Sequence, residues 1–402
     1  MAVSDLRGVT QLTVAGVAGV VRLVEAMHHN IAIVPRLIAR PAQDHTTGVA
    51  RQVYRAIHGV VGLVGGGLDV LLGGLAPVLP QHSRWPGREA LVAALNGVLG
   101  DRLEVAGNPL AITMRLRRDG IALPAGRAAL AAALPRASGK LVVLIHGLCM
   151  NDLQWQRAGH DHGARLARDL GYTPIYLHYN SGLHVSVNGR AFAGQLERLV
   201  EAWPVPLTEV VLIGHSMGGL VARSAFHYGI EARHAWPRKV DGLVFLGTPH
   251  HGAPLARGGH WIDVLLGATR YSAPLARIGK VRSAGITDLR FGNVVDEDWV
   301  DRDRFARGGD RRMPAPLPQG VACFALGGST AKKGAARPGP WAGDGLVPVA
   351  SALGRHPSAR LHLAFDVSRQ RVVQSTGHLD LLASKAVYAQ IKGWLDGLHH
   401  AE

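Results

Sequence analysis

The sequence contains little cysteine, few aromatic residues and little charge for its length. Two cysteines in 402 residues cannot form the disulfide framework of a small secreted scaffold. Hydrophobic residues make up 47% of the chain, which is ample for a large buried core and excludes an intrinsically disordered chain. The length favours two or three domains, or one large domain with attachments.

The sequence also lacks an uninterrupted apolar run of transmembrane length. Residues 56–79 are long enough to span a bilayer, but Asp69 lies near their middle, and a central Asp costs about 3 kcal/mol on insertion scales. The start of the chain does not resemble a signal peptide, because Asp5 precedes its apolar stretch and Arg22 and Glu25 interrupt it. We therefore expect a cytoplasmic protein, with peripheral attachment to a membrane or a lipid granule left open.

Basic residues outnumber acidic ones by 44 to 29, which gives a formal net charge of +15. Such a balance suits nucleic acid, an anionic membrane surface or simply a basic proteome. No nucleic-acid-binding signature is present and aromatics are only 5%, so no nucleic-acid partner is expected. The better candidate partner is an anionic lipid surface, bound through the N-terminal helices. If truncating residues 1–100 left co-sedimentation with vesicles unchanged, this hypothesis would be rejected.

The chain divides by pattern near residue 105. Residues 1–104 predict a helical N-terminal extension, whereas in residues 105–402 apolar runs alternate with helical stretches. This alternation predicts a mostly parallel sheet flanked by helices, with an inserted cap or lid at about 255–319. Asp119-Gly120, between two short apolar runs, predicts a hairpin. The strands predicted after this hairpin are 140–147, 172–180, 209–216, 240–250, 320–328 and 359–367.

The strand predicted at 209–216 runs directly into the sequence GHSMGG at 214–219, which fits the G-x-S-x-G pattern. In this pattern a serine lies in a tight turn between a strand and a helix. Its Oγ projects above the sheet at a helix N-terminus, where the helix dipole favours developing negative charge. We therefore predict that Ser216 is a nucleophile.

A nucleophilic serine needs a base and an acid, which follow it in this order of strands as Asp or Glu and then His. Asp344 follows the fifth of these strands and His378 follows the sixth, so both lie where loops carry side chains to the top of the sheet. Asp366 and Asp380 are the rival acids, but only Asp344 lies in the loop after the fifth strand. We expect His378 to accept the proton of the serine hydroxyl and Asp344 to orient the imidazole of His378.

An oxyanion formed at this site needs two backbone N–H donors. Met217, directly after the nucleophile, supplies one, and Leu148, at the end of the first of these strands, is placed to supply the other. Cys149 lies beside this loop, but no exposing turn presents it, so we expect it to pack in the core.

Five motifs in this order resemble lipases and esterases of the α/β-hydrolase superfamily, bacterial lipase-like proteins among them. They are HGL at 146–148, GHSMGG at 214–219, FLGTPHHGAP at 245–254, DGLVP at 344–348 and HLD at 378–380. The resemblance covers roughly residues 105 to 400. It implies an α/β-hydrolase fold in which Ser216 is the nucleophile, Asp344 the acid and His378 the base.

The resemblance also bears on metal and substrate. In certain bacterial lipases the Asp of HLD binds calcium with an earlier Asp; Asp380 matches the first of these residues and no residue matches the second, so no calcium is expected. The His160-Asp161-His162 and His250-His251 groups are too small for a zinc site.

Substrate-binding positions are expected in the loop after the fourth strand and in the cap. His250 and His251 should line the pocket, and Trp261 and Leu265 suit an acyl chain, although plain packing of the cap explains the last two equally well.

These features predict a serine carboxylic-ester hydrolase that acts on hydrophobic acyl esters through an acyl-serine intermediate and needs no cofactor. An acyltransferase, a thioesterase or a polyester depolymerase would use the same three residues. A non-catalytic protein that binds lipid surfaces is a further alternative.

Overall fold

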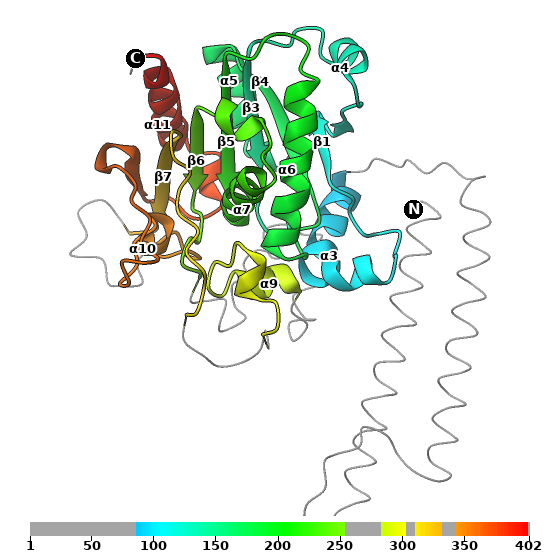
Figure 1. The fold of residues 1–402 in the computed structure, drawn as a ribbon. Coiled ribbons are helices and arrows are strands. Elements are labelled where there is room, and N and C mark those ends of the chain that lie inside the picture. Colours follow the sequence, from blue (N-terminus) through cyan, green and yellow to red (C-terminus); the bar gives the residue numbers. More distant parts are fainter. Residues whose placement is uncertain (1–85, 254–282, 303–309, 332–342, 401–402) are drawn as a thin grey trace, which may run out of the picture. The chain divides into compact units, whose positions relative to one another are not determined.

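The computed structural model describes residues 86–253, 283–302, 310–331 and 343–400 (Figure 1). These residues form an eight-stranded sheet in the order β2-β1-β4-β3-β5-β6-β7-β8. Strand β1 pairs antiparallel with β2 and β4, and all the other pairs are parallel. The strands are β1 Arg115–Arg118, β2 Ile121–Ala122, β3 Lys140–Ile145, β4 Thr173–His178, β5 Glu209–His215, β6 Gly242–Leu246, β7 Ala322–Ser329 and β8 Gln370–Gln374.

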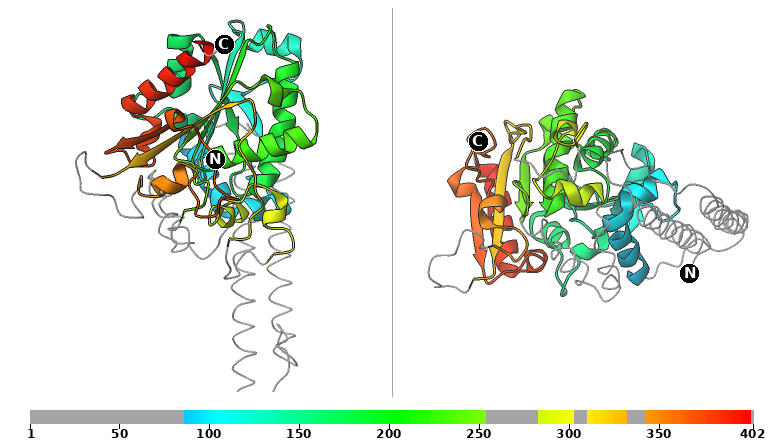
Figure 2. Two further views of the ribbon diagram at one scale, coloured as in Figure 1. Left: turned by 60° about the vertical axis from the view of Figure 1, so that its left-hand side comes forward. Right: turned by 90° about the horizontal axis from the view of Figure 1, so that it is seen from below.

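Helices cover both faces of this sheet (Figures 1 and 2). The described α-helices are α3 Pro86–Val105, α4 Arg127–Ala133, α5 His162–Leu170, α6 Val185–Glu201, α7 Met217–Glu231, α9 Ala284–Asp288, α10 Val349–Ala352 and α11 Lys385–Asp396. Alternate side chains of β3 enter two different cores: Leu141 packs in the cluster that contains residues of α6 and α7, whereas Val142 packs in the cluster that contains residues of α5 and α11. The predicted α/β-hydrolase fold is confirmed.

The predicted hairpin at Asp119-Gly120 is also present. Arg118 pairs with Ile121 across the turn, and the two intervening residues have φ angles of 52° and 72°. Two consecutive positive φ angles are typical of the tight turns that suit the right-handed twist of paired strands.

The strand predicted at 359–367 is wrong. The chain there is irregular and ends in the short 3-10 helix Val367–Arg369, and the last strand of the sheet is β8, Gln370–Gln374. Leu361, Leu363 and Phe365 are buried while the residues between them are exposed, which imitates a half-buried strand. This segment lies outside the sheet, and the Leu363 N–H donates to the Gly354 carbonyl at 2.9 Å.

The helix α3 belongs to the same compact unit as the sheet over most of its length. Contacts group Pro86–Arg102 with residues 112–402, whereas the sequence analysis placed these residues in the N-terminal extension. Within the described ranges, no helix is long and apolar enough to cross a membrane. Residues 56–79, Trp261 and Leu265 lie outside the described residues.

Candidate active site

Ser216 lies in a sharp turn between β5 and α7. Strand β5 is a central strand of the sheet and ends at His215, and α7 begins at Met217. Ser216 itself has φ 55° and ψ −124°, a conformation that side-chain-bearing residues rarely adopt. Its N–H donates to the Leu246 carbonyl at 2.8 Å, so the turn is anchored to the end of β6.

The turn requires glycine where it approaches β3. A Cβ added to Gly218 would lie 2.6 Å from the carbonyl oxygen of His146, closer than any real Cβ packs. Glycine at this position lets α7 start directly against the end of β3. The G-x-S-x-G pattern is thus explained by close packing, and the strained serine is held at the edge of the sheet where the parallel strands end.

His378 and Asp344 form a buried pair in the loops after β8 and β7. The Nδ1 atom of His378 lies 2.7 Å from Oδ2 of Asp344, and the His378 N–H donates to the Asp344 carbonyl at 2.9 Å. The other carboxylate oxygen of Asp344 accepts the N–H groups of Leu346 and Val347 at 3.0 and 2.8 Å. The carboxylate is therefore fixed, and it favours the tautomer of His378 that carries a proton on Nδ1 and leaves Nε2 as an acceptor.

His215 brings this pair next to the serine turn. Its Nε2 atom donates to the backbone carbonyl of His378 at 3.1 Å, and the two rings lie 4.8 Å apart. Burial, assisted by the neighbouring His378, lowers the pKa of His215 well below its usual value, so this imidazole is neutral. His215 is not among the site residues predicted from the sequence, although it lies between the glycine and the serine of the motif.

The loop after β3 lies against Ser216. A Cβ added to Gly147 would lie 3.0 Å from Cβ of Ser216, so the backbone of this loop passes directly beside the serine. The next residue, Leu148, is buried, and Cys149 has a positive φ of 60° that turns the chain away. Met217 is the first residue of α7, so its N–H has no acceptor within the helix. Of the two predicted oxyanion donors, Met217 therefore follows Ser216 directly, and Leu148 follows the glycine that lies beside it.

Two residues of this loop, His146 and Cys149, are buried. Burial raises the pKa of the Cys149 thiol to about 12, so the thiol stays protonated and is a poor nucleophile. Burial likewise lowers the pKa of His146 to about 3. The His146 ring stacks on Tyr179 with 4.3 Å between centroids, and the Tyr179 hydroxyl donates to the His146 carbonyl at 2.8 Å. Both side chains support the loop by packing.

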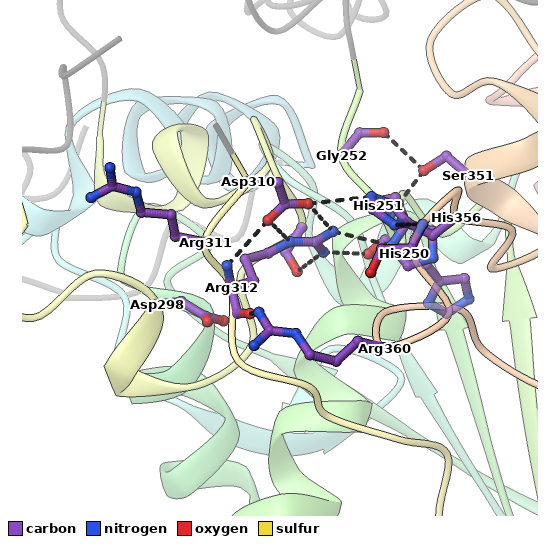
Figure 3. A network of polar contacts seen from close by, with 12 residues as sticks. His250, His251, Gly252, Asp298, Asp310, Arg311, Arg312, Ser351, His356 and Arg360 are labelled. Atoms are coloured by element: carbon purple, nitrogen blue, oxygen red, sulfur yellow. Dashed lines mark hydrogen bonds and ion pairs between the residues drawn. The ribbon is translucent and has the colours of Figure 1, made fainter. Parts of the chain in front are cut away.

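The structure places His250 and His251 in a polar network beyond the end of β6 (Figure 3). His250 is fully buried against Phe245, with 4.7 Å between ring centroids. The Nε2 atom of His251 lies 2.9 Å from the Gly354 carbonyl oxygen, and its Nδ1 atom lies 3.1 Å from the guanidinium of Arg312. Burial lowers the pKa of both rings, that of His251 to about 3, so both are neutral.

Arg312 is the centre of this network. Its guanidinium pairs with Asp310 at 2.7 Å and donates to the carbonyls of His250 and Gly292 at 2.8 and 3.1 Å. The backbone carbonyl of Arg312 in turn accepts from Arg360 at 2.9 Å. Four segments distant in sequence are thus joined at one residue, Arg312 (Figure 3). No pattern in the sequence distinguishes Arg312 from its neighbours.

The His160-Asp161-His162 group has a structural role. Asp161 caps α5 by accepting the Ala164 N–H at 2.9 Å. His160 and His162 bond to each other at 2.8 Å, and His162 also contacts the Leu381 carbonyl at 2.9 Å. In the part of the chain that the structure describes, no three His, Cys, Asp or Glu residues are grouped so as to hold a metal ion.

Comparisons with known proteins agree with the type of domain. Residues 136–311 match the family described as PGAP1-like alpha/beta domain, which is less than half of the chain. A GPI inositol-deacylase from Schizosaccharomyces pombe is 41% identical over 63 residues, which are 16% of this chain and 5% of that protein. The match therefore spans only a small part of the relative's own length.

Solved structures of lipases are also similar. The mature lipase BlEst2 of Bacillus licheniformis is 19% identical, with a TM-score of 0.40 over 64% of this chain and 91% of its own. The lipase of Staphylococcus hyicus is 14% identical, with a TM-score of 0.39 over 66% of this chain and 97% of its own.

Proposed function

We propose that this protein is a serine hydrolase that cleaves carboxylic esters of hydrophobic acyl groups, with Ser216 as nucleophile, His378 as base and Asp344 as acid. The observation that carries the proposal is the strained Ser216 turn, joined through His215 to the buried His378–Asp344 pair. A residue with a side chain that is held at positive φ at the start of a helix lowers the stability of the folded state. Such strain is common at active sites.

In the proposed reaction Ser216 Oγ attacks the carbonyl carbon of the ester while His378 Nε2 accepts the hydroxyl proton. Asp344 stabilises the resulting imidazolium through its 2.7 Å contact with Nδ1. The N–H groups of Leu148 and Met217 stabilise the oxyanion. The protonated His378 then gives its proton to the leaving alcohol, and a water molecule, activated by the same histidine, hydrolyses the acyl-Ser216 ester.

The proposed substrate class is an acyl ester of a lipid. The sequence match to a GPI inositol-deacylase supports this class, because the name of that relative describes removal of an acyl group from an inositol lipid. The apolar residues predicted in the cap, Trp261 and Leu265, are consistent with an acyl chain. Acyl transfer to an alcohol and cleavage of thioesters or polyesters would use the same three residues, and competition between water and added acceptor alcohols distinguishes transfer from hydrolysis.

Turnover of p-nitrophenyl esters tests the proposal. Replacing Ser216 with alanine removes the attacking oxygen, so we expect kcat to fall by at least about 10³-fold, with the remaining rate close to that of the oxyanion donors alone. Ser358→Ala, at an exposed serine, is the matched control and should keep wild-type turnover. Equal turnover by the wild type and Ser216→Ala would refute the proposed nucleophile.

A further inference from the structure

Helix α3 contacts the loop that carries one of the proposed oxyanion donors. Gly97 of α3 packs on Cys149, the residue directly after Leu148: a Cβ added to Gly97 would lie 2.8 Å from the Cα atom and 2.9 Å from the backbone nitrogen of Cys149, and would also overlap its sulfur. Only glycine permits this separation. The backbone of the oxyanion loop is thus set against the backbone of α3.

A second contact joins α3 to the loop after β4. The Gly100 carbonyl accepts from Nδ2 of Asn180 at 3.0 Å, and a Cβ added to Gly100 would lie 2.8 Å from Cγ of the same side chain. Oδ1 of Asn180 accepts the Gly182 N–H at 3.1 Å. Both side-chain groups of Asn180, which is buried, are therefore engaged between the helix and its own loop.

The two contacts meet at Cys149. Ser181, next to Asn180, accepts the Cys149 N–H on its hydroxyl at 3.0 Å. Cys149 is therefore held on one side by Gly97 and on the other by a loop that α3 itself fixes. The bond to Ser181 fixes the peptide group that joins Leu148 to Cys149. This limits the placement of Leu148, whose own N–H belongs to the peptide group before it.

Helix α3 also contacts Ser283 and Ala284, which belong to the predicted cap. The Ser283 hydroxyl donates to the Gly97 carbonyl at 2.6 Å, and the Ala284 N–H donates to the Asp101 carboxylate at 3.1 Å. The same two turns of α3 therefore contact the oxyanion loop, the loop after β4 and the segment that leads into α9. This arrangement explains why small residues and a short acidic side chain occupy one side of this helix.

We propose that α3 is a positioning element of the active site: Gly97 and Gly100 hold the Leu148 peptide in the orientation in which its N–H stabilises the oxyanion. This inference rests on the proposed function. It assigns a role in catalysis to a helix that precedes the hydrolase motifs in the sequence. A misplacement of about 1 Å at such a donor can cost about 100-fold in rate.

The test is a substitution with a compensating partner. Gly97→Ala pushes Cys149 and Leu148 away, so kcat for a p-nitrophenyl ester should fall about 10- to 100-fold while KM changes less than about twofold. Cys149→Gly removes the overlapping sulfur and suits the positive φ, but it leaves the backbone contacts at 2.8 and 2.9 Å, so Gly97→Ala/Cys149→Gly should recover only part of the lost kcat. Gly393→Ala in α11, where an added Cβ meets nothing within 4 Å, is the matched control and should keep wild-type kcat.

A second variant, Ser181→Ala, tests the same inference if Gly97→Ala folds poorly. Ser181→Ala removes the acceptor of the Cys149 N–H without adding volume, and it should also lower kcat more than it changes KM. Wild-type kcat in both Gly97→Ala and Ser181→Ala would overturn the inference. A wild-type protein without esterase turnover would instead contradict the proposed function itself.

Discussion

His215 connects two loops that lie 163 residues apart in the chain. Its Nε2–H group holds the carbonyl of His378, while the N–H of His378 is held by the Asp344 carbonyl at 2.9 Å. The backbone of the proposed base is thus fixed on both sides, and one of the two anchors is the residue that precedes the nucleophile. The backbone of His378 is therefore positioned by two neighbouring residues, His215 and Asp344.

Replacing this anchor should impair turnover. His215→Leu removes the donor and leaves the His378 carbonyl without it, so we expect kcat to fall about 10- to 100-fold with little change in KM. His215→Gln keeps an N–H donor at a comparable distance from the backbone and should retain more of the wild-type kcat. Steady-state kinetics on a p-nitrophenyl ester distinguish the two, and equal loss in both variants would show that the imidazole acts only by filling space.

At the scale of elements, Arg312 fixes the end of the predicted cap to the loop after β6. Its side chain is only 6% exposed and satisfies two backbone carbonyls besides its pair with Asp310. Neighbouring Arg311 is exposed, and its side chain points away from the network (Figure 3). Adjacent arginines therefore have opposite environments.

This contrast gives a matched pair of variants. Arg312→Ala leaves two carbonyl oxygens and the Asp310 carboxylate without their donor, so we expect the free energy of unfolding to fall by about 3 kcal/mol. Arg311→Ala should change it by less than about 0.5 kcal/mol. Urea denaturation measures both, and equal stabilities of the two variants would contradict a structural role for the network.

The elements that the sequence predicts correctly are those buried on both faces. Strands β3 to β7 are apolar along most of their length because helices cover both sides of the sheet, and such runs are easily recognised. Strand β8 lies at the edge of the sheet and is partly exposed, so its polar sequence gave no signal, while the alternating residues at 361–365 imitated a strand.

The same reasoning separates the parts of the candidate site. Asp344 and His378 were predictable because parallel strands end at one edge of a sheet, which brings together the residues that follow these strands. In the structure, His378 Nδ1 lies 2.7 Å from Asp344 Oδ2. The contacts of His215 and Arg312 were not predictable, because their partners lie 163 and about 60 residues away and no motif marks them. The positions of Gly97 and Gly100 three residues apart in a predicted helix were a signal of close packing, but not of its partner.

At the scale of the whole molecule, buried neutral histidines couple folding to pH. Burial lowers the pKa of His146 and His251 to about 3 and that of His162 to about 4, and it lowers the pKa values of His215 and His250 well below 6.5. In the unfolded chain these groups titrate near 6.5. Below that pH the unfolded chain therefore binds protons that the folded chain does not bind.

The protein should accordingly lose stability as the pH falls below about 6.5. Each histidine of this kind lowers the free energy of unfolding by up to about 1.4 kcal/mol per pH unit, until the pH reaches its pKa in the folded state. Urea denaturation at pH 7.5, 6.5, 5.5 and 4.5 measures the effect, which should be small between the first two values and steep afterwards. A constant free energy of unfolding from pH 7.5 to 4.5 would contradict the assignment of these rings as buried and neutral.

The central claim is that Ser216 forms a covalent bond to the acyl group during turnover. A fluorophosphonate reacts with an activated serine to give a stable adduct, which intact mass measurement and peptide mapping can locate. We expect one adduct per chain, on Ser216, with esterase turnover lost in proportion to labelling and no adduct on Ser216→Ala. Loss of turnover without modification of Ser216, or equal labelling of Ser216→Ala, would contradict the account.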